Sequence, residues 1–188
     1  MPDANDRRVL RTQRVLREAF IALLRKKNYD DITVKDILTQ ADVGRSTFYA
    51  HCTGKEDLLR LGLRNLQTEL AQHIHSFERS SSGDLTFSLP LLEHVASHRD
   101  LYPALGRLRG QDIVQREMRR LVFELVQRDL KSMALDASCP QDFLAYYITG
   151  AFMSVLFLQL EQHFAASPAQ VDALFQRTVS SGLASYRR

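Results

Sequence analysis

The sequence predicts an all-α protein. Glycine and proline are scarce, with 8 and 5 in 188 residues, tryptophan is absent, and runs of β-branched residues are few. Apolar residues recur at helical spacing in segments that short polar breaks separate. The chain is 45% hydrophobic and 25% charged, which is typical of a globular protein with one good-sized core or a small module joined to a larger one.

Apolar spacing and helix-breaking residues together define the expected elements. In chain order the predicted helices cover residues 7–27, 34–40, 45–51, 55–77, 85–97, 101–108, 111–134, 141–162 and 168–186. Pro140 and Pro168 stand at helix starts, where a missing N–H group costs little. Residues 1–6 are expected to form a loose tail, and the polar run 79–84 a loop.

Basic residues are concentrated in the first third of the chain. Residues 1–60 hold twelve Lys and Arg against nine Asp and Glu, whereas residues 61–188 hold thirteen of each. In the first helix, Leu16, Phe20 and Leu23 form an apolar stripe, and arginines lie off that stripe at positions 7, 11, 14 and 17. This charge suggests a polyanionic partner for the N-terminal end, and a merely solvated basic face is the alternative.

A well-defined helix start lies at Thr33. The Thr33 hydroxyl is expected to cap the helix 34–40, and Asp36 stands three residues on, in the capping-box position. Ile32 and Ile37 occupy the two positions of a hydrophobic staple. The helix that begins here is therefore specified locally.

Two short helices, 34–40 and 45–51, are joined by the four-residue turn 41–44. Neither is long enough to be stable alone, and their layout is that of a helix-turn-helix, whose second helix enters the DNA major groove. Phe48 is the natural inward residue of the second helix. The side chains expected to be available to DNA, including those at helix starts that favour phosphate, are Thr33, Lys35, Arg45, Ser46, Thr47, Tyr49, His51 and Lys55.

Residues 12–62 resemble the N-terminal domain of the TetR family of bacterial transcriptional regulators. The resemblance implies a three-helix DNA-binding domain at residues 1–54, joined by the helix 55–78 to a helical regulatory and dimerisation domain within 55–188. The run 46–51, followed by 55–58, is specific to that family. The matching residues are Ala19, Phe20, Leu23, Tyr29, Thr33, Val34, Ile37, Ala41, Val43, Thr47, Phe48, Tyr49, His51, Lys55, Glu56 and Leu58.

The resemblance also implies roles for single residues. Thr33 and Lys55 would hold phosphates, and Tyr49 and His51 would lie at the DNA backbone or at thymine. Base edges would be faced by Lys35, Arg45, Ser46 and Thr47.

Three positions depart from the family pattern. Asp42 stands where glycine is usual, and Asp can partly replace glycine in a left-handed turn. Gly44 stands where serine often caps the recognition helix, and Cys52 replaces a usual aromatic residue. We expect the second helix to be less firmly capped and packed as a result.

The helix 141–162 is apolar nearly all round, so it must be buried on most sides, and a second subunit is a natural cover. In the resembling family the last two long helices of each subunit pair in a dimer interface, while burial within one subunit is the alternative. The residues expected at a homodimer interface are Phe143, Gly150, Ala151, Ser154, Leu158, Val171, Leu174, Phe175, Val179 and Leu183.

Membrane, metal and redox chemistry are not expected. The longest apolar stretch, 145–160, is interrupted by polar residues and is shorter than a membrane span, and the N-terminus lacks an apolar signal core, so a cytoplasmic protein is predicted. Cys52 and Cys139 form no Cys-x-x-Cys pair. His94 and His98 are spaced i, i+4, but the Glu of a metalloprotease motif does not lie between them, so no metal or cofactor is predicted.

Together these features predict a dimeric, DNA-binding transcriptional regulator. We expect a repressor that a small-molecule effector releases from a palindromic operator, although repression and activation are not separable from sequence. An enzyme is disfavoured because the sequence has no Gly-rich phosphate loop or nucleophile elbow, and a helical ligand carrier would not need the 33–55 cluster. The effector pocket is expected among the middle helices, lined by Phe87, Leu91, Val95, Tyr102, Leu105, Met118, Phe123 and Tyr147.

Overall fold

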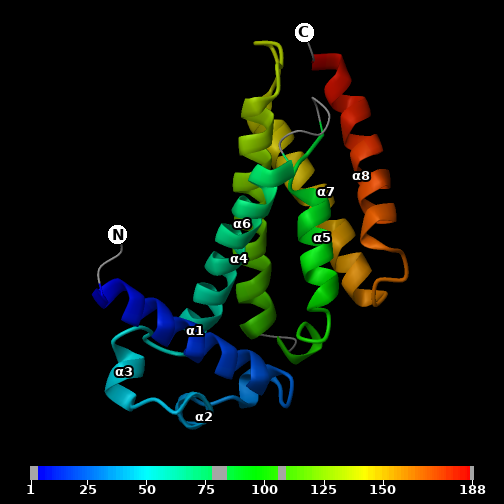
Figure 1. Ribbon diagram of the computed structural model, residues 1–188. Helices are drawn as coiled ribbons and strands as arrows, with labels where there is room; N and C mark the ends of the chain where they lie inside the picture. Colours follow the sequence, from blue (N-terminus) through cyan, green and yellow to red (C-terminus); the bar gives the residue numbers. More distant parts are fainter. Residues whose placement is uncertain (1–3, 78–83, 106–108, 187–188) are drawn as a thin grey trace. The chain divides into compact units, whose positions relative to one another are not determined.

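A computed structural model of the chain describes residues 4–77, 84–105 and 109–186, and these form helices with no strand among them (Figure 1). The predicted all-α fold is confirmed. The α-helices are α1 (Ala4–Leu24), α2 (Val34–Ala41), α3 (Arg45–Tyr49), α4 (Lys55–Phe77), α5 (Ser88–Ser97), α6 (Arg109–Ser132), α7 (Gln141–Glu161) and α8 (Pro168–Leu183). Short 3-10 turns are η1 (Tyr29–Asp31), η2 (Pro103–Leu105) and η3 (Ala184–Tyr186).

The chain divides into two compact units. Unit 1 comprises Met1–Asn65 and Asp100–Glu117, and unit 2 comprises Leu66–Arg99 and Met118–Arg188. The helices α4 and α6 each contribute to both units. The sequence placed a boundary after residue 54 and did not indicate that a segment after α5 belongs with the N-terminal unit.

Several expected boundaries differ from the structure. Residues 4–6 belong to α1 rather than to a loose tail. Of the expected helix 101–108, the described part, 101–105, contains the 3-10 turn η2 and no α-helix, because a proline at 103 disfavours helical backbone at the residue before it. Residues 106–108 lie outside the described residues, as does most of the expected loop 79–84.

The residues before α5 are held by side chains from other helices. The helix begins at Ser88 rather than at 85. Thr86 N–H donates to the Asp129 carboxylate at 2.6 Å, and Leu85 N–H donates to the Gln176 amide oxygen at 3.0 Å.

The core of unit 1 forms around α1 and the turn that follows it. The side chains of Leu16, Phe20, Ile37 and Phe48 are all buried, and α1 packs against α2. The ring of Tyr29, which is fully buried, meets Phe20 edge-on with ring centroids 6.1 Å apart. These contacts hold the two short helices that could not be stable alone.

Unit 2 has an aromatic core with hydrogen-bonded polar side chains beside it. The rings of Phe87, Phe152 and Phe175 pack in series, at 5.0 and 5.2 Å between centroids. Beside them, Ser88 Oγ lies 2.5 Å from Asp172 Oδ1, and partial burial raises the pKa of that carboxyl. Figure 1 shows α8 alongside α5 and α7, and α5 contacts both of these helices.

The helix α7 has 21 residues and is long and apolar enough to cross a membrane by those two criteria alone. The sequence-based argument that this stretch is too short and too polar is therefore wrong. A core helix of a helical bundle meets the same criteria, and Ala145, Ile148, Phe152 and Leu156 of α7 are buried in unit 2.

Candidate nucleic-acid interface

The helix α2 begins with the capping box that the sequence predicts. Asp36 N–H donates to Thr33 Oγ1 at 3.2 Å, and the Asp36 carboxylate accepts from the Thr33 amide at 2.8 Å and from its hydroxyl at 2.7 Å. Lys27 Nζ lies 2.8 Å from the same carboxylate. Hydrogen bonding to Lys27, followed by Thr33, holds the pKa of Asp36 well below its ordinary value.

These bonds occupy both the amide and the hydroxyl of Thr33. An anion at the start of α2 could therefore accept hydrogen bonds only from the backbone amides of Val34 and Lys35, which have no intrahelical acceptor. The Lys35 side chain is exposed beside them.

The turn between α2 and α3 has the conformation that the sequence suggests. Asp42 adopts the left-handed region, with φ 53° and ψ 49°, and Val43 N–H donates to Leu38 O at 3.2 Å. Gly44 precedes α3 with φ −70°, and no side chain caps that helix. The expected weak cap on α3 is confirmed.

The helix α3 spans five residues and buries one of them. Phe48 is fully buried, whereas Arg45, Ser46, Thr47 and Tyr49 are exposed. The Tyr49 ring is 52% exposed and meets Phe48 edge-on at 5.3 Å, which fixes its direction away from the core. Within the described residues, no hydrogen bond or ion pair engages the side chains of Arg45, Ser46 or Thr47.

His51 and Cys52 follow α3 rather than extending it. The helix ends at Tyr49, two residues before the predicted end, and His51 is half-buried in the turn. Cys52 is buried, and this burial raises the pKa of its thiol.

Lys55 makes contacts that the sequence did not predict. Its ammonium donates to the carbonyl oxygens of Tyr29 at 2.7 Å, Ile32 at 2.9 Å and Asp30 at 3.1 Å, and it lies 4.5 Å from the centre of the Tyr29 ring. An ammonium group has three hydrogens to donate, so these carbonyls engage all of them. The side chain expected to hold a phosphate is thus bound to the residues that precede α2.

The start of α4 is held by a second unpredicted group of contacts. Thr53 donates to the Asp57 carboxylate from its hydroxyl, and from its amide at 3.0 Å, which lowers the pKa of Asp57. Arg60 lies 3.4 Å from Asp57 and 3.6 Å from Glu117 of α6, within unit 1. The residue types alone give no signal for the Arg60–Glu117 pair, which are 57 positions apart.

The segment after α5 packs closely on the turn before α2. A Cβ atom at Gly110 would lie 2.2 Å from the Leu105 carbonyl oxygen and 3.0 Å from Cγ of Tyr29. Arg25, just after α1, forms a 3.0 Å ion pair with Asp100. Gly110 and η2 therefore lie against the turn that Lys55 holds.

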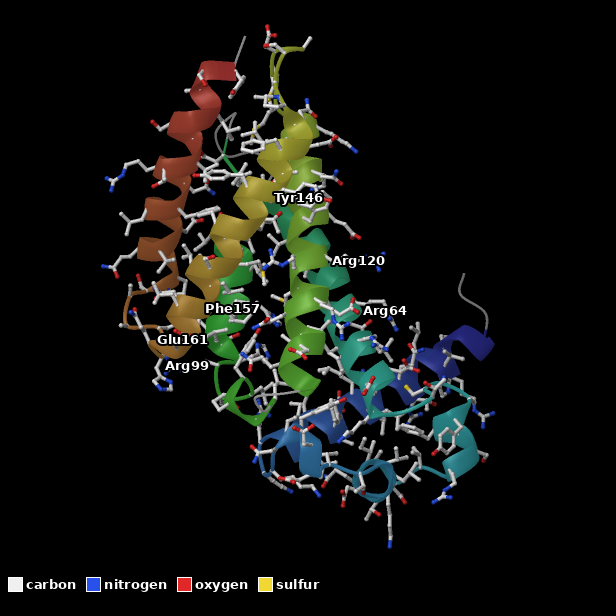
Figure 2. All side chains as sticks on the ribbon, turned by 180° about the vertical axis from the view of Figure 1, so that it is seen from behind. Arg64, Arg99, Arg120, Tyr146, Phe157 and Glu161 are labelled. Carbon is white, nitrogen blue, oxygen red and sulfur yellow. The ribbon has the colours of Figure 1, made fainter. Side chains whose placement is uncertain are left out.

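A different surface is formed by α7 and α8 in unit 2 (Figure 2). Large apolar side chains lie open to solvent there, with exposed fractions of 67% for Phe143, 71% for Tyr146, 59% for Tyr147, 47% for Leu158 and 56% for Leu174. Ser154 is exposed between them, and Gly150 and Ala151 are half-buried. Tyr146, which Figure 2 labels, was not among the expected interface residues.

Four expected interface residues of α8 do not lie on this surface. They are spaced by four positions, so they share one helix face, and that face is turned into unit 2 against α5 and α7. Their assignment to a dimer interface is corrected accordingly. The four are Val171, Phe175, Val179 and Leu183.

The residues expected to line an effector pocket lie in different parts of the chain. Tyr102 and Leu105 belong to unit 1, whereas the buried side chains of unit 2 include those of Phe87, Leu91, Val95 and Met118. Phe123 packs on Tyr146, with ring centroids 4.7 Å apart. Tyr147 is 59% exposed on the outer face of α7, so its assignment to an internal pocket is wrong.

Two buried polar atoms of α7 were missed by the sequence reasoning. Thr149 Oγ1 and Gln159 Oε1 have no hydrogen-bond partner among the described residues. Buried polar atoms are normally paired, so these two are suited to meet a polar group from outside the chain.

His94 and His98 stack with ring centroids 4.4 Å apart on α5. Burial, followed by the neighbouring His98, lowers the pKa of His94 to about 4. His98 Nδ1 lies 2.9 Å from both the Ser97 hydroxyl and the His94 carbonyl oxygen. The two histidines thus contact each other and their neighbours on α5. No group of three metal-ligating side chains occurs in the described ranges.

Two families of known proteins match the sequence of this chain. The family described as bacterial regulatory proteins, tetR family, matches residues 16–61, and the family described as transcriptional regulator C-terminal region matches residues 85–181, which is more than half of the chain. The first match contains α2 and α3, and the second contains α5, α6, α7 and nearly all of α8.

Individual proteins are similar to this chain over most of its length. The HTH-type transcriptional regulator YxbF of Bacillus subtilis (strain 168) is 27% identical over 167 residues, which are 87% of this chain and 43% of YxbF, so the chain spans less than half of that relative's length. A TetR transcriptional regulator from Streptococcus agalactiae 2603V is 25% identical, with a TM-score of 0.58 over 93% of this chain and 97% of that one. The dihydroxyacetone kinase operon activator DhaS shares the fold, with a TM-score of 0.69 and 18% identity over 94% of this chain and 98% of its own.

Proposed function

The chain belongs to the TetR family of bacterial regulators, and from this premise we propose that it is a homodimeric repressor that reads a palindromic operator and is released by a small-molecule effector. The family membership makes it a DNA-binding transcriptional regulator rather than an enzyme. The strongest support is the exposure of α3: Phe48 is its one buried side chain, and four side chains able to contact DNA are open to solvent.

The proposed contacts of α3 follow from the chemistry of those side chains. Arg45 can pair with the O6 and N7 acceptors of guanine, and the hydroxyls of Ser46 and Thr47 can bond base edges or phosphates. The Tyr49 ring suits a thymine methyl group or a phosphate. Lys35, in the first turn of α2, would share the groove.

Phosphate contacts would position the motif on the duplex. The open amides at the start of α2 and the half-buried His51 are suited to this task. For Thr33 and Lys55 we propose an indirect role, because Thr33 is engaged by Asp36 and the Lys55 ammonium by three carbonyl oxygens. Thr33 would fix the start of α2, and Lys55 would hold the two ends of the helix-turn-helix together.

We propose that the exposed face of α7 and α8 forms the homodimer interface. Phe143, Tyr147 and Leu158 repeat at helical spacing on α7, with Gly150 and Ser154 between them as small residues that allow close approach. Monomers seldom leave so many large apolar side chains open on adjacent helices. A two-fold dimer would present two copies of α3 to half-sites about 34–36 Å apart.

We place the effector site within unit 2. Phe87, Leu91 and Met118 supply an apolar lining, and the unpaired atoms of Thr149 and Gln159 supply polar partners. An effector releases DNA only if it binds the DNA-free conformation more tightly than the DNA-bound one. The proposed ligand is therefore a largely apolar molecule with at least one hydrogen-bonding group.

The experiment is selection of DNA by the full chain, followed by binding to the selected duplex. We expect preference for a palindrome and affinity that falls as salt rises. Tyr49→Ala should abolish specific binding while leaving the dimer intact by light scattering. Equal retention of selected and random duplexes by the unsubstituted protein would refute the proposed function.

Repression is tested separately from DNA binding, because DhaS has the same fold and is an activator. In vitro transcription from a promoter containing the selected duplex should fall when the protein is added. A rise in transcript would overturn the repressor assignment without affecting the DNA-binding one.

A further inference from the structure

The helix α1 begins well before the core of unit 1. It starts at Ala4, and from Arg7 onwards the first buried side chain is that of Leu16. From Arg7 to Val15 every side chain is exposed or half-buried, and Leu10 is 60% exposed. These turns extend beyond the packed part of the helix, and short helices without such packing are only marginally stable in water.

This projecting segment is strongly basic. Residues 7–15, named here the basic arm, contain Arg7, Arg8, Arg11 and Arg14 and no acidic residue. The first acid after them is Glu18, which lies 3.9 Å from Arg14 in a pair whose side chains are both about two-thirds exposed. Among the described residues, no carboxylate pairs with Arg7, Arg8 or Arg11.

The spacing of the arginines suits a row of phosphates. At 100° per residue, Arg7, Arg11 and Arg14 fall within an arc of about 60° on the helix. They span about 10 Å along the axis, at a rise of 1.5 Å per residue, which corresponds to about three nucleotides of one strand.

The basic arm lies at the end of unit 1 that holds α3. Figures 1 and 2 both show the N-terminal half of α1 on the α3 side of this unit, while the other end of α1 leads towards η1 and α2. A duplex that receives α3 would therefore continue towards the arm.

We infer that the basic arm binds the phosphate backbone of duplex DNA beyond the half-site that α3 reads. The inference rests on the proposed DNA-binding function and adds a second contact that reads no bases. An anionic membrane is a poorer partner, because a helix that lies on a membrane needs an apolar face, and Leu10 is the one exposed large apolar side chain of the arm.

The test compares two duplexes that share one core, selected from a random-sequence pool by the unsubstituted full chain. The short duplex ends at the edges of the two half-sites, and the long duplex extends about 12 base pairs beyond each edge. The arm variant is Arg7→Gln/Arg11→Gln/Arg14→Gln, which removes the row of arginines described above, and glutamine keeps good helix propensity. The control variant removes the same charge from exposed positions of unit 2, by Arg99→Gln/Arg119→Gln/Lys131→Gln.

We expect the unsubstituted protein to bind the long duplex more tightly than the short one, and the arm variant to lose that difference. On the long duplex at 0.1 M salt the arm variant should bind about 10-fold more weakly or worse. Its plot of log affinity against log salt should lose about 0.9 in slope for each arginine that met a phosphate. The control variant should keep both the affinity difference and the slope.

Two results would overturn the inference and leave the proposed function standing. One is equal binding of short and long duplexes by the unsubstituted protein, which would reassign the arm to another anionic partner such as an acidic protein. The other is an arm variant with unchanged affinity and salt slope. Failure of the unsubstituted protein to select any duplex would instead refute the proposed function, and the inference with it.

Discussion

Replacing Lys55 with methionine tests whether this residue stabilises the helix-turn-helix or binds DNA directly. The Lys55 ammonium links the first turn of α4 to the carbonyl oxygens of Tyr29, Asp30 and Ile32, just before α2. It thereby joins the two ends of the segment that contains α2 and α3. Methionine keeps most of the side-chain length but removes all three donors.

The expected loss of stability follows from those contacts. A hydrogen bond to a charged group contributes about 1.5–3 kcal/mol, but three bonds to one partly exposed ammonium are not additive. We expect Lys55→Met to lower the free energy of unfolding by about 2–4 kcal/mol. At about 2–4 °C per kcal/mol for a chain of this size, the melting temperature should fall by about 4–16 °C.

The assay combines calorimetry with salt-dependent DNA binding. If Lys55 acts through the fold, the variant should melt earlier, and its salt slope should be unchanged even where its affinity falls. A direct phosphate contact predicts the opposite: normal melting and a slope smaller by about 0.9 per protomer. That second pattern would refute our reasoning. Lys35→Met is the matched control, since its exposed side chain should affect DNA affinity and leave the melting temperature unchanged.

Three further substitutions probe local features. Gly44→Ser should raise the free energy of unfolding by about 0.5–1 kcal/mol in urea titrations, because φ is −70°, the new Cβ would have no neighbour closer than 3.9 Å, and serine supplies the missing cap of α3. Gly110→Ala should lower the free energy of unfolding by about 1–3 kcal/mol, since its Cβ would lie 2.2 Å from a backbone carbonyl oxygen. Gly62→Ala is the control, because open space surrounds that position and the substitution should not destabilise the protein. His94→Gln should reduce the stability lost between pH 7 and pH 5 in thermal melts. Burial, followed by His98, lowers the folded-state pKa of His94 to about 4 from 6.5. Between these values acid protonates His94 in the unfolded chain but not in the folded one, which lowers the free energy of unfolding. A His94→Gln variant whose melting temperature depends on pH as that of the unsubstituted protein does would contradict this.

The features predicted correctly from sequence depend on residues close together in the chain. Thr33 and Asp36 of the capping box are three positions apart, and the left-handed turn at Asp42 depends on one residue. The burial of Phe48 follows from helical spacing within a five-residue helix. Such patterns carry their own geometry, because backbone angles and side-chain reach determine them.

The features missed depend on contacts between distant segments. The sequence placed Lys55 at a helix start, where phosphate is favoured, and gave no signal for the bonds of its ammonium to carbonyl groups about 25 residues earlier. The spacing of Val171 and Phe175 correctly indicated an apolar stripe on α8, yet spacing does not say whether a stripe faces its own subunit or another. That choice depends on the neighbouring helices, which here are α5 and α7.

The position of α3 is therefore set mainly by residues outside α3. The helix has five residues and no side-chain cap, so its own hydrogen bonds cannot hold it, and Phe48 provides its one buried side chain. The segments on either side are tied together at Lys55, and Gly110 packs against Tyr29 in the same turn. On the proposed indirect role of Lys55, substitutions at Lys55 or Gly110 should alter DNA affinity without removing a DNA contact. Affinity measurements on α3 variants alone would then underestimate how many residues determine DNA binding.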